Sequence, residues 1–232
     1  MNIYLIPNFL AENTPSYIPE IVKDTIKKLK YFFVEDERNA RRYISSLKLG
    51  LTISDMFFFR LDKDTTPEMV RNTFQQIPQN AEIGILSDAG CPGIADPCAV
   101  AVGVAHQSGY KVIPLPGPSS ILLALMASGL NGQKFAFQGY LPIEKNERIK
   151  AIRQLEIESS KKQQTQIFIE TPYRNQSLLH DLVSNCMPQT LLCIATLITS
   201  PSEFLVTKPV NEWKKALPDI QKKETVFLML AQ

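Results

Sequence analysis

Acidic and basic side chains follow directly after two predicted strands, one in each half of the chain. The strands are the apolar segments 31–34 and 166–169, and the side chains are Glu35, Asp36, Arg38, Glu170 and Arg174. A carboxylate in such a place can accept a proton from a reacting hydroxyl group, and an arginine can hold a phosphate or a carboxylate. Surface ion pairs without function are the alternative, because they are common and contribute little stability.

Two loops rich in glycine and proline follow two other predicted strands. Residues 87–97 come after strand 81–86, and residues 116–120 come after strand 112–115. Glycine lets a backbone approach a ligand, proline fixes the shape of a loop, and open α/β sheets bind small molecules at the carboxyl ends of strands. The predicted ligand-binding residues of the two loops are Ser87, Asp88, Ala89, Gly90, Pro116, Gly117, Ser119 and Ser120.

Helix capping is a second role for polar residues in these loops. We expect Asp96 to cap a helix that begins near Pro97, and either Ser119 or Ser120 to cap the apolar helix that follows them. Capping and ligand binding are compatible, since a helix N-terminus attracts carboxylate and phosphate groups.

The order of elements predicts an α/β fold with two α/β domains. Apolar strands and amphipathic helices alternate in the first half, whereas consecutive strands late in the chain predict hairpins and a mixed sheet. We place an N-terminal domain at residues 1–116 and a C-terminal domain with the mixed sheet at residues 117–232. Residues 139–142, Gly-Tyr-Leu-Pro, are expected to form a turn.

Composition excludes several classes of protein. The chain has 232 residues, of which 44% are hydrophobic, and a net charge of +2, which is unlike a strongly basic RNA-coating protein. There is no apolar run of about 18 residues, so no membrane span is expected, and the N-terminal residues do not resemble a signal peptide. The four cysteines and two histidines have no zinc-ligand spacing, so we expect no metal site and a reducing, cytoplasmic location.

Two common nucleotide-binding motifs do not occur in the chain. Neither G-x-x-x-x-G-K-[ST] nor G-x-G-x-x-G is found. A P-loop kinase and a nicotinamide-dependent dehydrogenase are therefore disfavoured.

Taken together, the motifs resemble the tetrapyrrole (corrin/porphyrin) methylase superfamily. The matching segments are Ser-Asp-Ala-Gly-x-Pro-Gly-x-x-Asp-Pro at 87–97, Pro-Gly-Pro-Ser at 116–119, Ala-Ser-Gly-Leu at 127–130 and Phe-x-Gly-Tyr-Leu-Pro at 137–142. Glu-Asp-x-Arg at 35–38 and Glu-Thr-Pro-x-Arg at 170–174 are similar to its ribosomal RNA small subunit methyltransferase I branch, which methylates a cytidine ribose 2′-oxygen. The resemblance spans nearly the whole chain in the right order.

The resemblance implies an S-adenosylmethionine-dependent methyltransferase with the cofactor bound in a cleft between two α/β domains. It also implies a homodimer, and ribosomal RNA or the small ribosomal subunit as partner. Besides the two glycine–proline loops, it places Tyr140, Pro172 and Tyr173 beside the cofactor. Glu35, Asp36 and Glu170 are then the candidate proton acceptors, and the sequence does not choose among them.

The chain departs from that branch at two places on the substrate side. The loop at 7–10 lacks the expected glycine, and Phe-Phe-Phe-Arg at 57–60 replaces a Tyr-His-Glu-His-like stretch. Three alternatives stay open: a small-molecule methylase of the tetrapyrrole type, a non-catalytic cofactor-binding module, and a nucleotide-binding or regulatory protein. The apolar run 57–59 supports a dimer, because an alternating strand turns at least one ring outward.

Two basic clusters have two possible roles. They are Lys23, Lys27, Lys28 and Lys30, and Arg38, Arg41 and Arg42. Either they are solvated helix faces, or they follow an RNA backbone and make binding depend steeply on salt.

Overall fold

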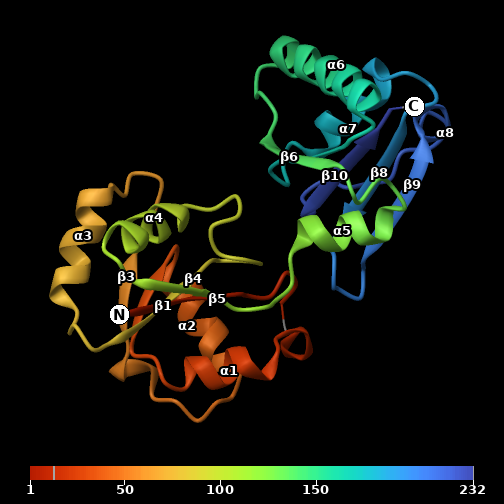
Figure 1. Ribbon diagram of the computed structural model, residues 1–232. Coiled ribbons are helices and arrows are strands. Elements are labelled where there is room, and N and C mark those ends of the chain that lie inside the picture. The colour runs from red at the N-terminus through yellow and green to blue at the C-terminus, as the bar shows by residue number, and fades with distance from the viewer. Residues whose placement is uncertain (13, 232) are drawn as a thin grey trace. The chain divides into compact units, whose positions relative to one another are not determined.

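The protein has two compact units, Met1–Ser119 and Ser120–Gln232, each built on its own five-stranded sheet (Figure 1). The structure is a computed structural model, and it describes residues 1–12 and 14–231. Helices pack on the sheet in each unit, so the predicted fold class of two α/β domains is confirmed. Within the described residues, no helix combines the length and the apolar character needed to cross a bilayer.

The first unit holds an entirely parallel sheet with the strand order β3-β2-β4-β1-β5. Its strands are β1 (Asn2–Ile6), β2 (Tyr31–Val34), β3 (Phe57–Arg60), β4 (Glu82–Leu86) and β5 (Lys111–Pro114). Leu86, the last residue of β4, pairs with Val34 on one side and with Ile6 on the other. The loops that begin at residues 7, 35 and 87 therefore leave three adjacent strands at the same edge of the sheet.

Helices cover both faces of this sheet (Figure 1). They are α1 (Glu20–Ile26), α2 (Glu37–Ser46), α3 (Pro67–Gln76) and α4 (Ala99–Gln107), with short 3-10 turns at Pro15–Tyr17 and Ile53–Asp55. The buried side chains of α1 and α2 pack with Ile6 and Phe32, and those of α3 and α4 pack with Ile3 and Phe33. Alternate residues of each strand thus serve two separate cores, as expected for a doubly covered parallel sheet.

The second unit holds the predicted mixed sheet, with the order β6-β7-β10-β8-β9. Its strands are β6 (Phe135–Tyr140), β7 (Thr165–Ile169), β8 (Leu191–Thr196), β9 (Phe204–Pro209) and β10 (Thr225–Leu230), and its helices are α5 (Ser120–Ser128), α6 (Lys145–Lys162), α7 (Asn175–Asn185) and α8 (Val210–Trp213). Only β6 and β7 are parallel to each other, while β10 and β9 pair antiparallel with their neighbours.

The turn expected at residues 139–142 is wrong in its first half. Gly139 and Tyr140 belong to β6, and the register with β7 shifts between Phe137 and Tyr140. The glycine has a φ of 67°, which allows the irregularity and lets Tyr140 pair with Ile169.

A buried ion pair joins α6 to α7. Arg148 Nε donates a hydrogen bond to Asp181 Oδ2 at 2.8 Å, and its Nη1 donates to the carbonyl of Ile143 at 2.9 Å. Only 6% of the Arg148 side chain and 10% of the Asp181 side chain are exposed. Both charges are therefore removed from water, and each depends on the other for compensation.

The aromatic run of β3 is only partly exposed. Phe57 is 52% exposed and stacks on Tyr31 at 5.2 Å between ring centroids, whereas Phe58 and Phe59 pack against the two cores. Phe57 is therefore the ring of this run that is available to another chain. The homodimer stays a prediction.

Candidate active site

Asn8 joins the loop that follows β1 to the 87–90 loop through hydrogen bonds. This side chain is 5% exposed, and its Nδ2 donates to the carbonyls of Ser87 at 3.0 Å and Asp88 at 2.9 Å. Its backbone N–H donates to the carbonyl of Gly90 at 2.8 Å, and the N–H of Gly90 donates to the carbonyl of Phe9 at 3.3 Å. Four hydrogen bonds therefore fix the backbone of the 87–90 loop before any ligand arrives.

The remainder of the 87–97 loop turns back on itself through left-handed backbone. Gly90, Gly93 and Ala95 have φ values of 67°, 82° and 60°, and the alanine is a residue type that rarely adopts this conformation. Asp96 Oδ1 accepts hydrogen bonds from the N–H of Gly93 at 2.7 Å and of Cys98 at 3.0 Å. The expectation that Asp96 caps the next helix is wrong, since α4 begins at residue 99 and Asp96 closes the loop instead.

The 116–120 loop lies against both the loop that begins at Pro7 and the 87–97 loop. A Cβ atom added to Gly117 would come within 2.2 Å of Pro7 Cβ and 2.3 Å of Pro7 Cγ. The Cys91 thiol lies 3.4 Å from the carbonyl oxygen of Pro118, within the range of a sulfur hydrogen bond. Glycine is thus required at position 117 for the close approach of two loops, besides any room it leaves for a ligand.

Residues at the start of α2 and just before it also form hydrogen bonds with Asp88. Asp36 Oδ1 accepts from the N–H of Asn39 at 2.9 Å and caps the helix. Asn39 Nδ2 in turn donates to Asp88 Oδ2 at 2.9 Å, and the backbone N–H of Asp88 donates to Glu35 Oε1 at 2.9 Å. Two of the three candidate proton acceptors, Glu35 and Asp36, therefore organise the loop and the helix.

A cavity of about 450 Å³ opens beside these loops. Phe9, Asn39, Tyr43 and Asp88 are among its lining residues, and Tyr43 is fixed by a 2.7 Å hydrogen bond from its hydroxyl to the carbonyl of Pro7. Its volume lies in the range of small-molecule sites. Neither Glu35 nor Asp36 lines it, and the carboxylates among its lining residues are Asp88 and Glu12.

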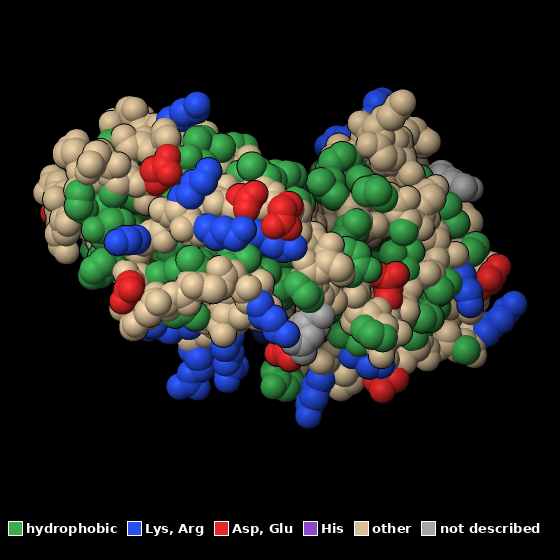
Figure 2. All heavy atoms as spheres, turned by 90° about the horizontal axis from the view of Figure 1, so that it is seen from below, with side chains coloured by type: hydrophobic (Ala, Val, Ile, Leu, Met, Phe, Trp, Pro, Cys, Tyr) green, Lys and Arg blue, Asp and Glu red, His purple; other side chains and the backbone are tan. Residues whose placement is uncertain are grey.

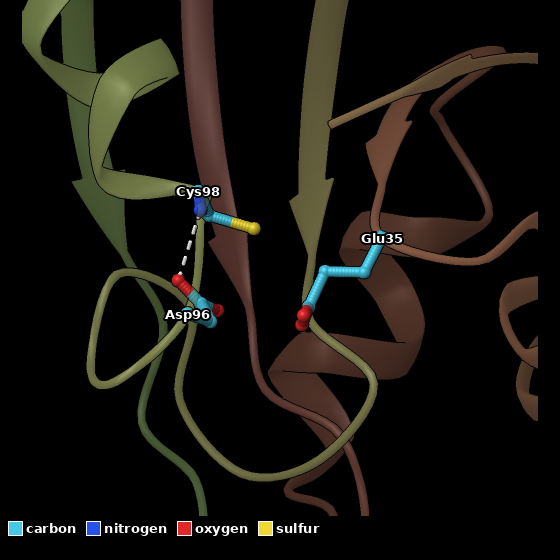
Figure 3. Close-up of side chains that lie close together, drawn as sticks. All are labelled: Glu35, Asp96 and Cys98. Carbon is cyan, nitrogen blue, oxygen red and sulfur yellow. Dashed lines mark hydrogen bonds between the residues drawn. The ribbon is translucent and has the colours of Figure 1, made fainter. Parts of the chain in front are cut away.

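Glu35, Asp96 and Cys98 come together beneath the 87–97 loop (Figure 3). One carboxylate oxygen from each acid and the Cys98 sulfur, the atoms that could coordinate a metal ion, all lie within 4.8 Å of one another. Among the described residues, no hydrogen-bond partner is found for the buried Asp96 Oδ2. Burial raises the pKa of both carboxyl groups above their ordinary values, and it raises the pKa of the Cys98 thiol so far that the thiol stays neutral. The neighbouring charge of Asp96 adds to the effect of burial on the pKa of Glu35.

The acid–base pair of the second unit forms a closed turn after β7. Glu170 Oε1 accepts from Arg174 Nη2 and from the N–H of Thr171, both at 2.6 Å, and the Glu170 side chain is fully buried. Tyr140 and Tyr173 are 55% and 73% exposed. The pair therefore shapes the turn, and the two rings are the parts of this region that remain open to a ligand.

Comparison with known proteins gives the family. No protein-family model matches the chain. The ribosomal RNA small subunit methyltransferase I of Leptospira borgpetersenii serovar Hardjo-bovis (strain L550) is 32% identical over 194 residues, which cover 81% of this chain and 74% of that protein. The chain belongs to the ribosomal RNA small subunit methyltransferase I family. The Vibrio cholerae member is 28% identical over 230 residues, covering 98% of this chain and 76% of that protein.

Solved protein structures share the fold of this chain. The uroporphyrin-III C-methyl transferase of Thermus thermophilus, complexed with S-adenyl homocysteine, matches with a TM-score of 0.57 at 15% identity, covering 99% of this chain and 97% of that one. The expected tetrapyrrole methylase fold is confirmed, and so is the expected class of enzyme, a methyltransferase.

Sequence reasoning missed Asn8 and Asn39, which connect three loops of this methyltransferase. Asn8 lies two residues after β1 and Asn39 lies in the first turn of α2, and these positions near the carboxyl ends of β1 and β2 were the available signal. The roles of all the predicted site residues stay predictions. The structure brings those of the first unit to one sheet edge, and it joins Glu170 to Arg174 within the second.

We expect an Asp96→Asn variant to be more stable than the wild type at about pH 8, and we expect this difference in stability to disappear at about pH 4. Burial raises the pKa of Asp96 above 3.8, so the folded state binds the proton more tightly than the unfolded state. The stability associated with that proton is present below the unfolded pKa and is lost as pH rises through the folded pKa. The amide carries no charge, and its oxygen can still accept from Gly93 and Cys98. Thermal melts over the pH range measure this, and a difference that does not change with pH would contradict it.

Proposed function

We propose that this protein transfers a methyl group from S-adenosylmethionine to a ribose 2′-hydroxyl of ribosomal RNA in the cytoplasm. Family membership supports the acceptor, since the relatives are named for small-subunit ribosomal RNA. The observation that carries the proposal is the cavity at the carboxyl edge of the first sheet, where a fixed carboxylate, two amides and two aromatic rings meet.

The 87–90 and 116–120 loops are the proposed cofactor-binding segments. Gly90 has left-handed backbone, and a Cβ there would approach Leu10 Cδ2 at 3.2 Å, so the 87–90 loop needs glycine to keep the shape that it offers to such a ligand. S-adenosylmethionine supplies the methyl group on a sulfonium. Charge is neutralised in such a transfer, so the protein has mainly to orient the reactants and exclude water. The hydrogen bonds of Asn8 and Glu35 supply that rigidity.

Asp88 is the proposed acceptor of the hydroxyl proton. Its Oδ2 is held by Asn39, and within the described part of the chain no hydrogen bond reaches its Oδ1. Glu35 is then a positioning residue, because it binds the backbone N–H of Asp88 and does not line the cavity.

Two variants test this assignment with one chemical change. Asp88→Asn should keep binding S-adenosylhomocysteine in a calorimetric titration but should lower methyl transfer to small ribosomal subunits by about 100-fold or more, the usual effect of a lost general base. Asp55→Asn is the matched control, since Asp55 is exposed in the 3-10 turn Ile53–Asp55 and does not line the cavity, so transfer should stay unchanged.

Each outcome of that pair of experiments bears on one part of the proposal. Wild-type transfer rates in Asp88→Asn would remove Asp88 as the base. Wild-type protein that does not bind S-adenosylhomocysteine would contradict the cofactor site. Tight binding of a porphyrinoid, seen by absorbance, together with its methylation would favour a small-molecule acceptor.

A further inference from the structure

Three arginines line a groove next to the cavity of the candidate active site. Arg38 and Arg42 lie one turn apart on α2. Arg60 is the last residue of β3, the outermost strand of the sheet, which pairs with β2. The groove has a volume of about 520 Å³. Asn39 and Arg42 line both the groove and the cavity, so the two spaces adjoin along α2.

The guanidinium groups of the groove are available to a ligand. In the described part of the chain, no hydrogen bond or ion pair engages the side chain of Arg38 or Arg42, and Arg60 has only a 3.6 Å contact with Asp62 and a 75% exposed side chain. The acidic residues of the groove are already committed, since Asp36 caps α2 and Glu37 pairs with Arg41. The three guanidinium groups therefore outnumber the two carboxylates of the groove, one of which is paired with Arg41.

Arg41 shows the contrast within one helix. Its Nη2 lies 2.7 Å from Glu37 Oε1, and its guanidinium carbon lies 4.6 Å from the centre of the Phe58 ring. Its Nη1 also donates to the carbonyl of Ile53 at 3.4 Å. Arg41 thus holds α2 against β3, and the arginine cluster of the sequence divides into one structural residue and two free ones.

The basic residues elsewhere are not arranged in this way. On the face drawn in Figure 2, one short row of Lys and Arg side chains lies beside two acidic ones, and the remaining basic side chains are scattered toward the margins. On α1, Lys23 pairs with Glu20 at 3.1 Å and Lys27 pairs with Asp24 at 2.9 Å. A local site with two free arginines and one weakly paired arginine therefore differs from the paired lysines of α1.

We propose that this groove binds the phosphate backbone of an unpaired RNA segment next to the acceptor nucleotide, which enters the adjoining cavity. The inference rests on the proposed function and names the surface that holds its substrate. A planar guanidinium can bind two phosphate oxygens at once, and such contacts fix the position of a nucleic acid without reading its sequence. The groove sets the register of the strand, and the cavity receives one nucleoside.

The test compares two triple variants with the same change in charge. One is Arg38→Gln/Arg42→Gln/Arg60→Gln, and its control is Lys23→Gln/Lys27→Gln/Lys28→Gln on α1. Binding of a fluorescent single-stranded RNA of about 12 nucleotides is measured by anisotropy, without cofactor, at several salt concentrations. The arginine variant should lower the slope of log Kd against log salt by about 2, because each single-strand phosphate contact contributes about 0.7.

The lysine control should change that slope little, and both variants should bind S-adenosylhomocysteine as the wild type does. An equal loss in the two variants would overturn the groove, since net charge alone would then explain binding. An unchanged slope in the arginine variant would overturn it as well. Absence of RNA binding with intact cofactor binding would also overturn it and would point to an acidic protein partner. Failure of cofactor binding alone would contradict the proposed function and leave the RNA result standing.

Discussion

A Gly117→Ala substitution should weaken S-adenosylhomocysteine binding about tenfold, which corresponds to about 1.4 kcal/mol, and should also lower the melting temperature. The added methyl group would lie 2.2 Å from Pro7 Cβ, so one of the two loops must move. Forced repacking of this kind typically destabilises a protein by about 1–3 kcal/mol. The 116–120 loop, which we propose for the cofactor, is one of these two loops, so stability and affinity should fall together.

Gly103→Ala is the matched control for this experiment. Gly103 lies inside α4, and nothing lies within 4 Å of an added Cβ there. Alanine in a helix interior should stabilise the protein by about 0.5–1 kcal/mol and leave cofactor affinity unchanged. Calorimetry and thermal melts on the two variants measure the difference. A folded Gly117→Ala protein with wild-type affinity would remove the 116–120 loop from the cofactor site.

The second large effect is expected in the other unit. Arg148→Met should lower its free energy of unfolding by about 3–5 kcal/mol, because Asp181 would be left as a buried charge without its partner. The double variant Arg148→Met/Asp181→Leu should recover most of the loss, since neither charge is then buried. Lys150→Met is the control, and removing its exposed pair with Glu147 should change stability by at most about 1 kcal/mol.

Urea unfolding followed by tryptophan fluorescence measures these losses. Trp213 is the only tryptophan of the chain and lies buried in the core of the second unit, so its emission reports that unit. An Arg148→Met variant that unfolds at the wild-type urea concentration would show that Asp181 finds water or another partner.

Local sequence signals were sufficient for most elements. The predicted alternation of strands and helices in the first half is observed, and Pro67 at the start of α3 with Thr66 as its cap is one such local signal. The irregular strand end at Tyr140 was not predictable, because its pairing with Ile169 is set by a neighbouring strand. Sequence periodicity carries no information on such a register shift.

The site was less predictable than the fold because its contacts join distant parts of the chain. Asn8 contacts residues 79 and 80 positions away, and Glu35 meets Asp96 and Cys98 only because β4 inserts beside β2. Strand order is not visible in a single sequence. Arg41 and Arg42 are adjacent in sequence, yet only the structure separates the residue packed on Phe58 from the one in the groove.

Methyl transfer to small ribosomal subunits tests the central claim most directly. The protein is incubated with methyl-labelled S-adenosylmethionine and subunits that lack the modification, and the RNA is then hydrolysed with alkali. A 2′-O-methyl group blocks cleavage of the adjacent phosphodiester bond, so we predict label in an alkali-stable dinucleotide. Label on a base or in protein, or no label from protein that binds S-adenosylhomocysteine, would contradict the account.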